Sequence, residues 1–212
     1  MVRLVPSVIH NFWFGYTRRE LAALAKPNQA QMRLWFSSQE DDDVIIKRTF
    51  GEHLRETSAM YASTTDYTVE NRSFEDVLAD IITLDQFSRV IHRKTALAFS
   101  NDRHAVELCK AALDCEGFAS DAAPLERLFL EMPLMHSETL ADHERLLALR
   151  GIEHAAVDVD AEHDAVRGSR RNSRRNGADE RRGGMRDFEP RLAVVGVLAA
   201  VERGLHHPHA GL

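Results

Sequence analysis

The stretch that decides the fold is residues 73–91, SFEDVLADIITLDQFSRVI. Ser73, followed three residues later by Asp76, is a variant of the capping box that opens helices. Apolar side chains then recur at helical spacing, at positions 74, 77, 78, 81, 82, 87 and 91. This pattern predicts a helix that turns one apolar face towards a protein core.

Helical periodicity also dominates the rest of the chain, and no segment alternates apolar and polar residues convincingly enough to predict a strand. Further helices are expected to begin after Pro6, at Asp41–Asp43, at Asn101 and at Pro124, with two more candidates at residues 152–166 and 192–201. Pro133 is expected to end the helix from Pro124, and Ser137 to begin the next. The fold class is therefore all-α, with antiparallel helix pairs that suit an α-solenoid-like stack.

Charge is distributed unevenly over the 212 residues. The net charge is −6, but residues 167–186 hold eight Arg against two acidic residues, which leaves −12 on the remainder. We therefore divide the chain into a helical domain of residues 1–166, an Arg- and Gly-rich loop or disordered segment of residues 167–190, and a C-terminal helix and tail of residues 191–212. A nucleic acid could bind only through Arg167–Arg186, and the acidic remainder together with the lack of interleaved aromatic residues argues against it.

The sequence has no feature typical of a secreted or membrane protein. Residues 1–6 lack the apolar core of a signal peptide, and the longest apolar run, residues 192–201, is about half a membrane span. Cys109 and Cys115 form no Cys-x-x-Cys motif and are expected to be reduced thiols, with Cys109 in the core. These observations predict a soluble cytoplasmic protein that does not associate with membranes.

Polar residues interrupt the apolar pattern near the end of the first stretch. Asp85 and Arg89 are four residues apart, so their side chains can pair on one face of a helix, beside Gln86. On a surface helix this is a weak ion pair. In a buried helix it needs further hydrogen bonds, and is then an internal strut or a functional site. The sequence leaves both interpretations open.

A second polar group follows at His136, Ser137 and Glu138. The free N–H groups at the helix start expected there suit an anion. In the structural alternative, Ser137 caps the helix, Glu138 complements its dipole and His136 lies on the surface. His136, His143 and Glu144 lack the spacing of a known metal motif, and the glycine-rich nucleotide motifs are absent, so neither a metal nor a cofactor is predicted.

Six short segments share their order and spacing with a bacterial family. They are Phe12–Gly15, Leu34–Phe36, Leu84–Arg89, Ala98–Asp102, Leu125–Leu130 and Met132–Glu138. Over about residues 8–150 the chain therefore resembles the family named domain of unknown function 924. This resemblance implies an all-helical fold similar to tetratricopeptide-repeat arrays, and it implies no activity.

The chain departs from the family pattern at several positions. Ser88 and Val90 stand where the family has Pro and Asn, and Met135 replaces an acidic residue. The family's C-terminal motif, FGRFPHRN, is reduced here to an Arg-Asn ending at residues 175–176. Composition also changes after about His163, so we predict that the C-terminal quarter is a remodelled or frame-shifted tail.

Two functions of different classes fit the sequence. In the first, the protein binds a small anionic ligand or a protein partner in a polar pocket formed by Trp13, Asp85, Gln86, Arg89, His136, Ser137 and Glu138. In the second, it is a hydrolase-like enzyme in which His136 or Glu138 is the general base and Asp85 orients that base. The second function requires Asp85 and His136 to lie within hydrogen-bond distance. The sequence does not predict an oligomeric state.

Overall fold

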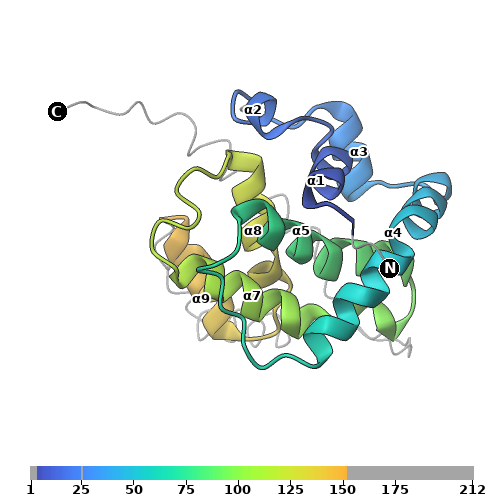
Figure 1. Ribbon diagram of the computed structural model, residues 1–212. Helices are drawn as coiled ribbons and strands as arrows, with labels where there is room; N and C mark the ends of the chain where they lie inside the picture. The colour runs from blue at the N-terminus through green and yellow to red at the C-terminus, as the bar shows by residue number, and fades with distance from the viewer. Residues whose placement is uncertain (1–3, 25, 152–212) are drawn as a thin grey trace, which may run out of the picture. The chain divides into compact units, whose positions relative to one another are not determined.

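The computed structural model describes residues 4–24 and 26–151, and every regular element in these residues is helical. The elements, labelled where there is room in Figure 1, are α1 (Pro6–Phe14), α2 (Arg18–Leu21), α3 (Gln29–Phe36), α4 (Glu40–Ala62), α5 (Phe74–Ile81), η1 (Ile82–Phe87), α6 (Ser88–Ile91), η2 (Ala96–Phe99), α7 (Asp102–Asp114), α8 (Pro124–His136) and α9 (Leu140–Leu149). η1 is a π-helix and η2 is a 3-10 helix. The predicted all-α class is confirmed, whereas the tetratricopeptide-like stacking stays a prediction.

The chain divides between Leu146 and Leu147 into two units, and the site described below lies in the first. The predicted segments 152–166, 167–190 and 191–212 lie outside the described residues, so the domain limits stay predictions. Among the helices that are described, none has both the length and the apolar character needed to cross a bilayer.

Local sequence signals set the ends of several helices. Pro6 occupies the first turn of α1, and Gly15, with a φ of 70°, ends it. Four acidic residues, Glu40–Asp43, form the first turn of α4 and complement the helix dipole. The hydroxyl oxygen of Ser73 accepts the backbone N–H of Asp76 at 3.1 Å and begins α5. These starts confirm the predictions made from the sequence.

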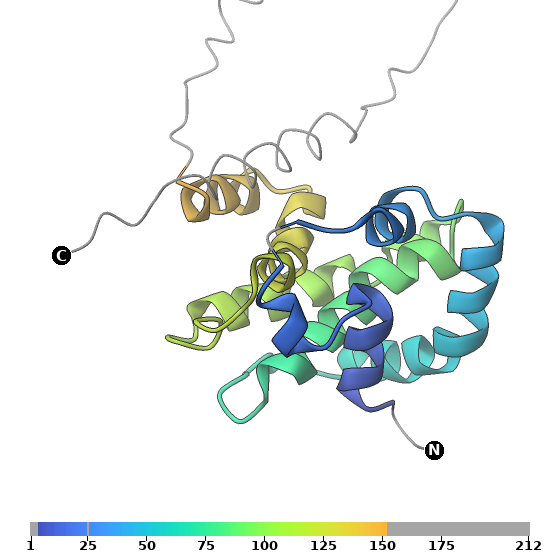
Figure 2. The ribbon, with the colours of Figure 1, turned by 90° about the horizontal axis from the view of Figure 1, so that it is seen from above.

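α5, η1 and α6 follow one another without a break over residues 74–91, and we call this stretch the central helix. α1, α7 and α8 contact α5, while α4 contacts η1 and α6. In Figure 1, α1 lies above α5 and α7 below it, and in the view of Figure 2, α4 runs along one side of these helices. From Val77 to Ser88 only Gln86 is not buried, so the helix is enclosed on all sides and not on one face alone.

Aromatic side chains of α1, α4 and α8 pack against one another and against the central helix. Phe87 stacks on Phe50 of α4 with ring centroids 4.5 Å apart. Trp13 of α1 meets Phe87 at 5.7 Å and Phe129 of α8 at 5.4 Å, both edge to face. The indole N–H of Trp35 donates to the backbone carbonyl of Trp13 at 3.0 Å. These contacts combine apolar burial with the preferred ring geometry.

The sequence prediction for α8 was wrong at its C-terminal end. Pro133 does not end the helix, which continues through it to His136. An interior proline costs about 3 kcal/mol because it removes a backbone hydrogen bond and clashes with the preceding turn. Continued winding of α8 buries Leu134 completely, which offsets part of this cost. α9 begins at Leu140 and not at Ser137. His136 is therefore the last residue of α8 and does not lie at the start of α9.

A buried carboxylate at the start of α8 links three helices. Glu126 accepts hydrogen bonds from His10 Nε2 at 2.8 Å, Arg18 Nε at 2.7 Å and the backbone N–H of Ala123 at 2.8 Å. Burial by itself raises the pKa of Glu126, but the hydrogen bonds from these three donors outweigh it and hold the pKa below its usual value.

Glu126→Gln should lower the free energy of unfolding at pH 7 by about 3 kcal/mol, because a buried charged network loses its shared acceptor. Since the pKa of Glu126 is lowered by folding, its contribution is present above the unfolded-state pKa and is lost as the pH falls through the folded-state pKa. Urea unfolding from pH 7 down to pH 2.5 should therefore show a shallower loss of stability in the variant than in the wild type, with the difference developing below the unfolded-state pKa of about 4.3. Glu116→Gln, at an exposed carboxylate, is the control. Parallel pH profiles for wild type and Glu126→Gln would contradict this role.

Candidate active site

Asp85 and His136 meet although 51 residues separate them in the chain. Asp85 lies in η1, His136 is the last residue of α8, and the imidazole Nδ1 lies 2.7 Å from the carboxylate Oδ1. An ionised carboxylate only accepts hydrogen bonds, so the imidazole donates its Nδ1–H. Nε2 of His136 makes no hydrogen bond to any residue that the structure describes.

The two side chains differ in their access to water. Asp85 is 1% exposed, whereas the His136 side chain is 26% exposed. Burial by itself raises the pKa of Asp85, but the interaction with His136, the charge of Arg89 and the hydrogen bond from Gln86 outweigh it, so the pKa is lowered. The result is an ionised, buried carboxylate behind an imidazole that solvent can reach.

The π-helix η1 carries Asp85 within the central helix. Such segments are rare and are frequently found at functional sites. The hydroxyl of Thr83 donates to the carbonyl of Ala79 at 2.7 Å. In a regular α-helix that carbonyl accepts the N–H of Thr83, so the hydroxyl competes with the α-helical pattern and favours the wider turn. Sequence periodicity gave no signal for this change.

Arg89 bridges two carboxylates. Its Nη2 lies 3.0 Å from Asp102 Oδ2 and 3.5 Å from Asp85 Oδ1, and its guanidinium carbon lies 5.0 Å from the centre of the Phe99 ring. The Asp85–Arg89 pair suggested by the sequence is therefore present and partly buried. Asp102 is not among the site residues predicted from the sequence, because its approach to Arg89 depends on how residues 92–101 fold back towards α6.

Asn101 occupies the cap position of α7 as predicted, but its side chain makes no capping bond. Its amide instead donates to the hydroxyl of Ser88 at 3.0 Å, and both side chains are buried. This hydrogen bond ties the start of α7 to α6 and so fixes the position of Asp102. Burial raises the pKa of Asp102, Arg89 lowers it and Asp85 raises it, with a net increase.

Two more predicted residues lie in or against the central helix. The amide Nε2 of Gln86 donates to the second oxygen of Asp85, so Gln86 belongs to the same hydrogen-bonded group. Trp13 lies in the aromatic core, where its ring contacts Phe87 and Phe129. No hydrogen bond or ring contact joins Trp13 to Asp85 or His136 within the described residues.

Ser137 and Glu138 do not join His136 at Asp85. The hydroxyl of Ser137 donates to Asp142 of α9 at 2.5 Å, and Asp142 also pairs with Lys110 of α7 at 2.8 Å. Glu138 is exposed and makes no hydrogen bond to a described residue. The reason is the position of the helix ends: α8 stops at His136, and the chain turns away before α9 begins.

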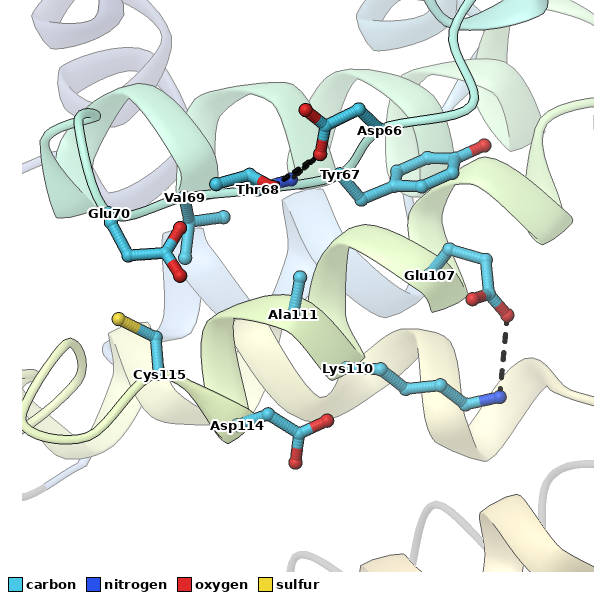
Figure 3. A pocket seen from close by; sticks show the side chains of 10 residues that line it. All are labelled: Asp66, Tyr67, Thr68, Val69, Glu70, Glu107, Lys110, Ala111, Asp114 and Cys115. Atoms are coloured by element: carbon cyan, nitrogen blue, oxygen red, sulfur yellow. Dashed lines mark hydrogen bonds and ion pairs between the residues drawn. The ribbon is translucent and has the colours of Figure 1, made fainter.

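A cavity of about 440 Å³ lies elsewhere, between residues 66–70 and α7 (Figure 3). None of the predicted site residues lines it. Its charged side chains are Asp66, Glu70, Glu107, Lys110 and Asp114, and Lys110 already pairs with Glu107. This lining is acidic on balance and does not favour an anionic ligand. Within residues 4–24 and 26–151, no three His, Cys, Asp or Glu side chains are placed to hold a metal ion.

Comparison with known families matches residues 9–181 to a family described as a bacterial protein of unknown function, DUF924. The chain belongs to this family. The match is longer than the resemblance over residues 8–150 expected from the motifs, and it continues into the Arg-rich segment. The remodelled or frame-shifted tail stays a prediction. No curated protein and no solved structure matches the chain.

His136→Ala should lower the free energy of unfolding at pH 7 by about 1–3 kcal/mol, because the buried Asp85 loses its 2.7 Å hydrogen bond to α8. The pKa of Asp85 is lowered by folding, so its stabilising contribution is present above the unfolded-state value of about 3.9 and is lost as the pH falls through the folded-state pKa. The stability difference from wild type should therefore shrink as the pH falls below about 3.9. Urea titrations monitored by circular dichroism would measure it. His143→Ala, at an exposed histidine of α9, should change little, and an equal loss there would refute the assignment.

Proposed function

We propose that this protein is a hydrolase-like enzyme in which His136 is the general base and Asp85 orients it. One observation carries the proposal: a buried carboxylate lies 2.7 Å from Nδ1 of a partly exposed imidazole on another helix. A base held in one tautomer by a carboxylate, with its other nitrogen free, is the arrangement used for proton transfer in hydrolysis.

The chemistry follows from the two imidazole nitrogens. Asp85 accepts the Nδ1–H of His136, so Nε2 keeps its lone pair. Nε2 removes a proton from a water molecule as the water oxygen bonds to an electrophilic carbonyl carbon or phosphorus. Asp85 stabilises the resulting imidazolium, which then returns the proton to the leaving group as its bond breaks. Water is the nucleophile in this proposal, since the hydroxyl of Ser137 is bonded to Asp142.

Arg89 supplies positive charge beside the base. Its Nη1 makes no hydrogen bond to a described residue, while Nη2 is held by Asp102 and Asp85. A donor already fixed in place can stabilise the negative charge that develops on a substrate oxygen without reorganising during the reaction. The role of Arg89 in this proposal is to stabilise the negative charge of the transition state.

The binding of a small anionic ligand receives less support. Arg89 is the cation that would attract the anion, but its charge is shared between Asp85 and Asp102. With a neutral imidazole, the group of Asp85, Arg89, Asp102 and His136 carries a net charge of −1, so it offers no surplus positive charge to bind an anion. The helix start expected at Ser137 is not there to compensate.

Hydrolysis of p-nitrophenyl acetate, p-nitrophenyl butyrate and bis-p-nitrophenyl phosphate would test the proposal. His136→Ala and Asp85→Asn should each lower kcat/KM by about 100-fold or more for the probe that the wild type hydrolyses. His143→Ala provides the matched control, and thermal melting followed by circular dichroism would verify that each variant is folded.

Equal rates in wild type, His136→Ala and Asp85→Asn would contradict the proposal. Loss of activity in Glu138→Gln, with His136→Ala still active, would instead assign the general base to Glu138. Failure of the wild type to hydrolyse any of the three probes above the rate in buffer would count against ester and phosphodiester substrates alike.

A further inference from the structure

Arg89 is held unequally by its two carboxylates. It lies 3.0 Å from Asp102 but 3.5 Å from Asp85, although Asp85 is its neighbour four residues earlier in the central helix. In a regular α-helix side chains at this spacing face each other, but Asp85 lies in the π-helical turn η1, so the spacing alone does not bring the two together. Asp85 is also the more deeply buried of the two carboxylates, so its attraction for a cation is screened less by water. Asp102 nevertheless holds the guanidinium at the shorter distance.

Asp102 is well placed to do this. It is the first residue of α7, and the Asn101–Ser88 hydrogen bond fixes that helix start against α6. The ring of Phe99, whose centre lies 5.0 Å from the guanidinium carbon, adds a cation–π contact to Arg89. The carboxylate of Asp102 thus approaches Arg89 from a separate, anchored element.

The Arg89–Asp102 pair does not reach its best geometry. Arg89 Nε and Asp102 Oδ1 are both buried and have no hydrogen-bond partner in the described residues. Arginine and carboxylate frequently join through two parallel hydrogen bonds, and only one is made here. This is the geometry expected of a guanidinium pulled between two carboxylates, with neither pair complete.

We propose that Asp102 is a positioning residue that draws Arg89 away from Asp85 and so reserves the Asp85 carboxylate for His136. This inference deepens the proposed function, on which it rests for the use that the protein makes of the Asp85–His136 pair. When Asp102 loses its charge, Arg89 moves fully onto Asp85. The carboxylate is then neutralised by an adjacent cation, and its hold on the Nδ1–H of His136 weakens.

The tautomer of His136 reports this competition without any substrate. Nitrogen-15 NMR of the labelled imidazole at pH 8.5 measures the ratio of the Nδ1–H to the Nε2–H form in the full chain. Asp102→Asn should lower that ratio at least about threefold, the change expected when a hydrogen bond to a charged group is partly lost. Asp102→Glu keeps the negative charge, so the tautomer ratio in this variant should stay close to the wild-type ratio. Asp114→Asn, at an exposed carboxylate at the end of α7, is the control.

The decisive variant is the double substitution Arg89→Met with Asp102→Asn. Removing the competing cation should return the tautomer ratio to the wild-type value, although two native interactions are lost. If Asp102 were only a structural support, the tautomer ratio of His136 in the double variant would differ from the wild-type ratio at least as much as it does in Asp102→Asn. That result, or an unchanged ratio in Asp102→Asn, would overturn the inference.

The experiment separates the inference from the proposed function. A lowered ratio in Asp102→Asn that the double variant restores, in a protein that hydrolyses none of the probes, would support the positioning role while the proposed function fails. If hydrolysis is lost in His136→Ala but the tautomer ratio is unchanged in Asp102→Asn, the proposed function is retained and the positioning role of Asp102 is overturned.

Discussion

The burial of the Asp85 carboxylate is the constraint on which the rest of the site depends. A charged group inside a helix enclosed on all sides is strongly destabilising unless its oxygens receive hydrogen bonds. Those bonds come from Gln86 and Arg89 on the central helix and from His136 on α8. α8 brings His136 to Asp85 only because the helix continues past Pro133. The hydrogen bond that Asp85 receives from His136 therefore depends on the continuation of α8 beyond the proline.

Two buried carboxylates, Glu126 and Asp85, each contact a histidine, and the two pairs differ in their access to solvent. His10 donates to Glu126 at 2.8 Å and is itself 2% exposed, so both partners are enclosed in the protein. His136 makes an equally short contact to Asp85 but keeps a quarter of its side chain exposed. The first pair holds helices together. Only the second can exchange a proton with a molecule from solution.

Sequence reasoning predicted features that local chemistry controls. The helix starts at Pro6, Ser73 and Pro124 depend on caps and dihedral restrictions within a few residues. The hydrolase-like function also requires Asp85 and His136 to lie within hydrogen-bond distance, as they do. Features set by tertiary packing were missed. The π-helical turn leaves no trace in apolar periodicity, the burial of Leu134 keeps α8 wound past a proline, and Asp102 reaches the site through the fold of residues 92–101.

One departure from the family pattern has a structural consequence at this site. Ser88 stands where the family pattern has proline, and its hydroxyl accepts the amide N–H of Asn101 at 3.0 Å. Proline has no side-chain oxygen and could not make this contact. The side-chain tether that fixes the start of α7, and with it Asp102, therefore depends on the serine. In this chain the serine thus supplies a side-chain hydrogen bond between α6 and the start of α7, where Asp102 lies.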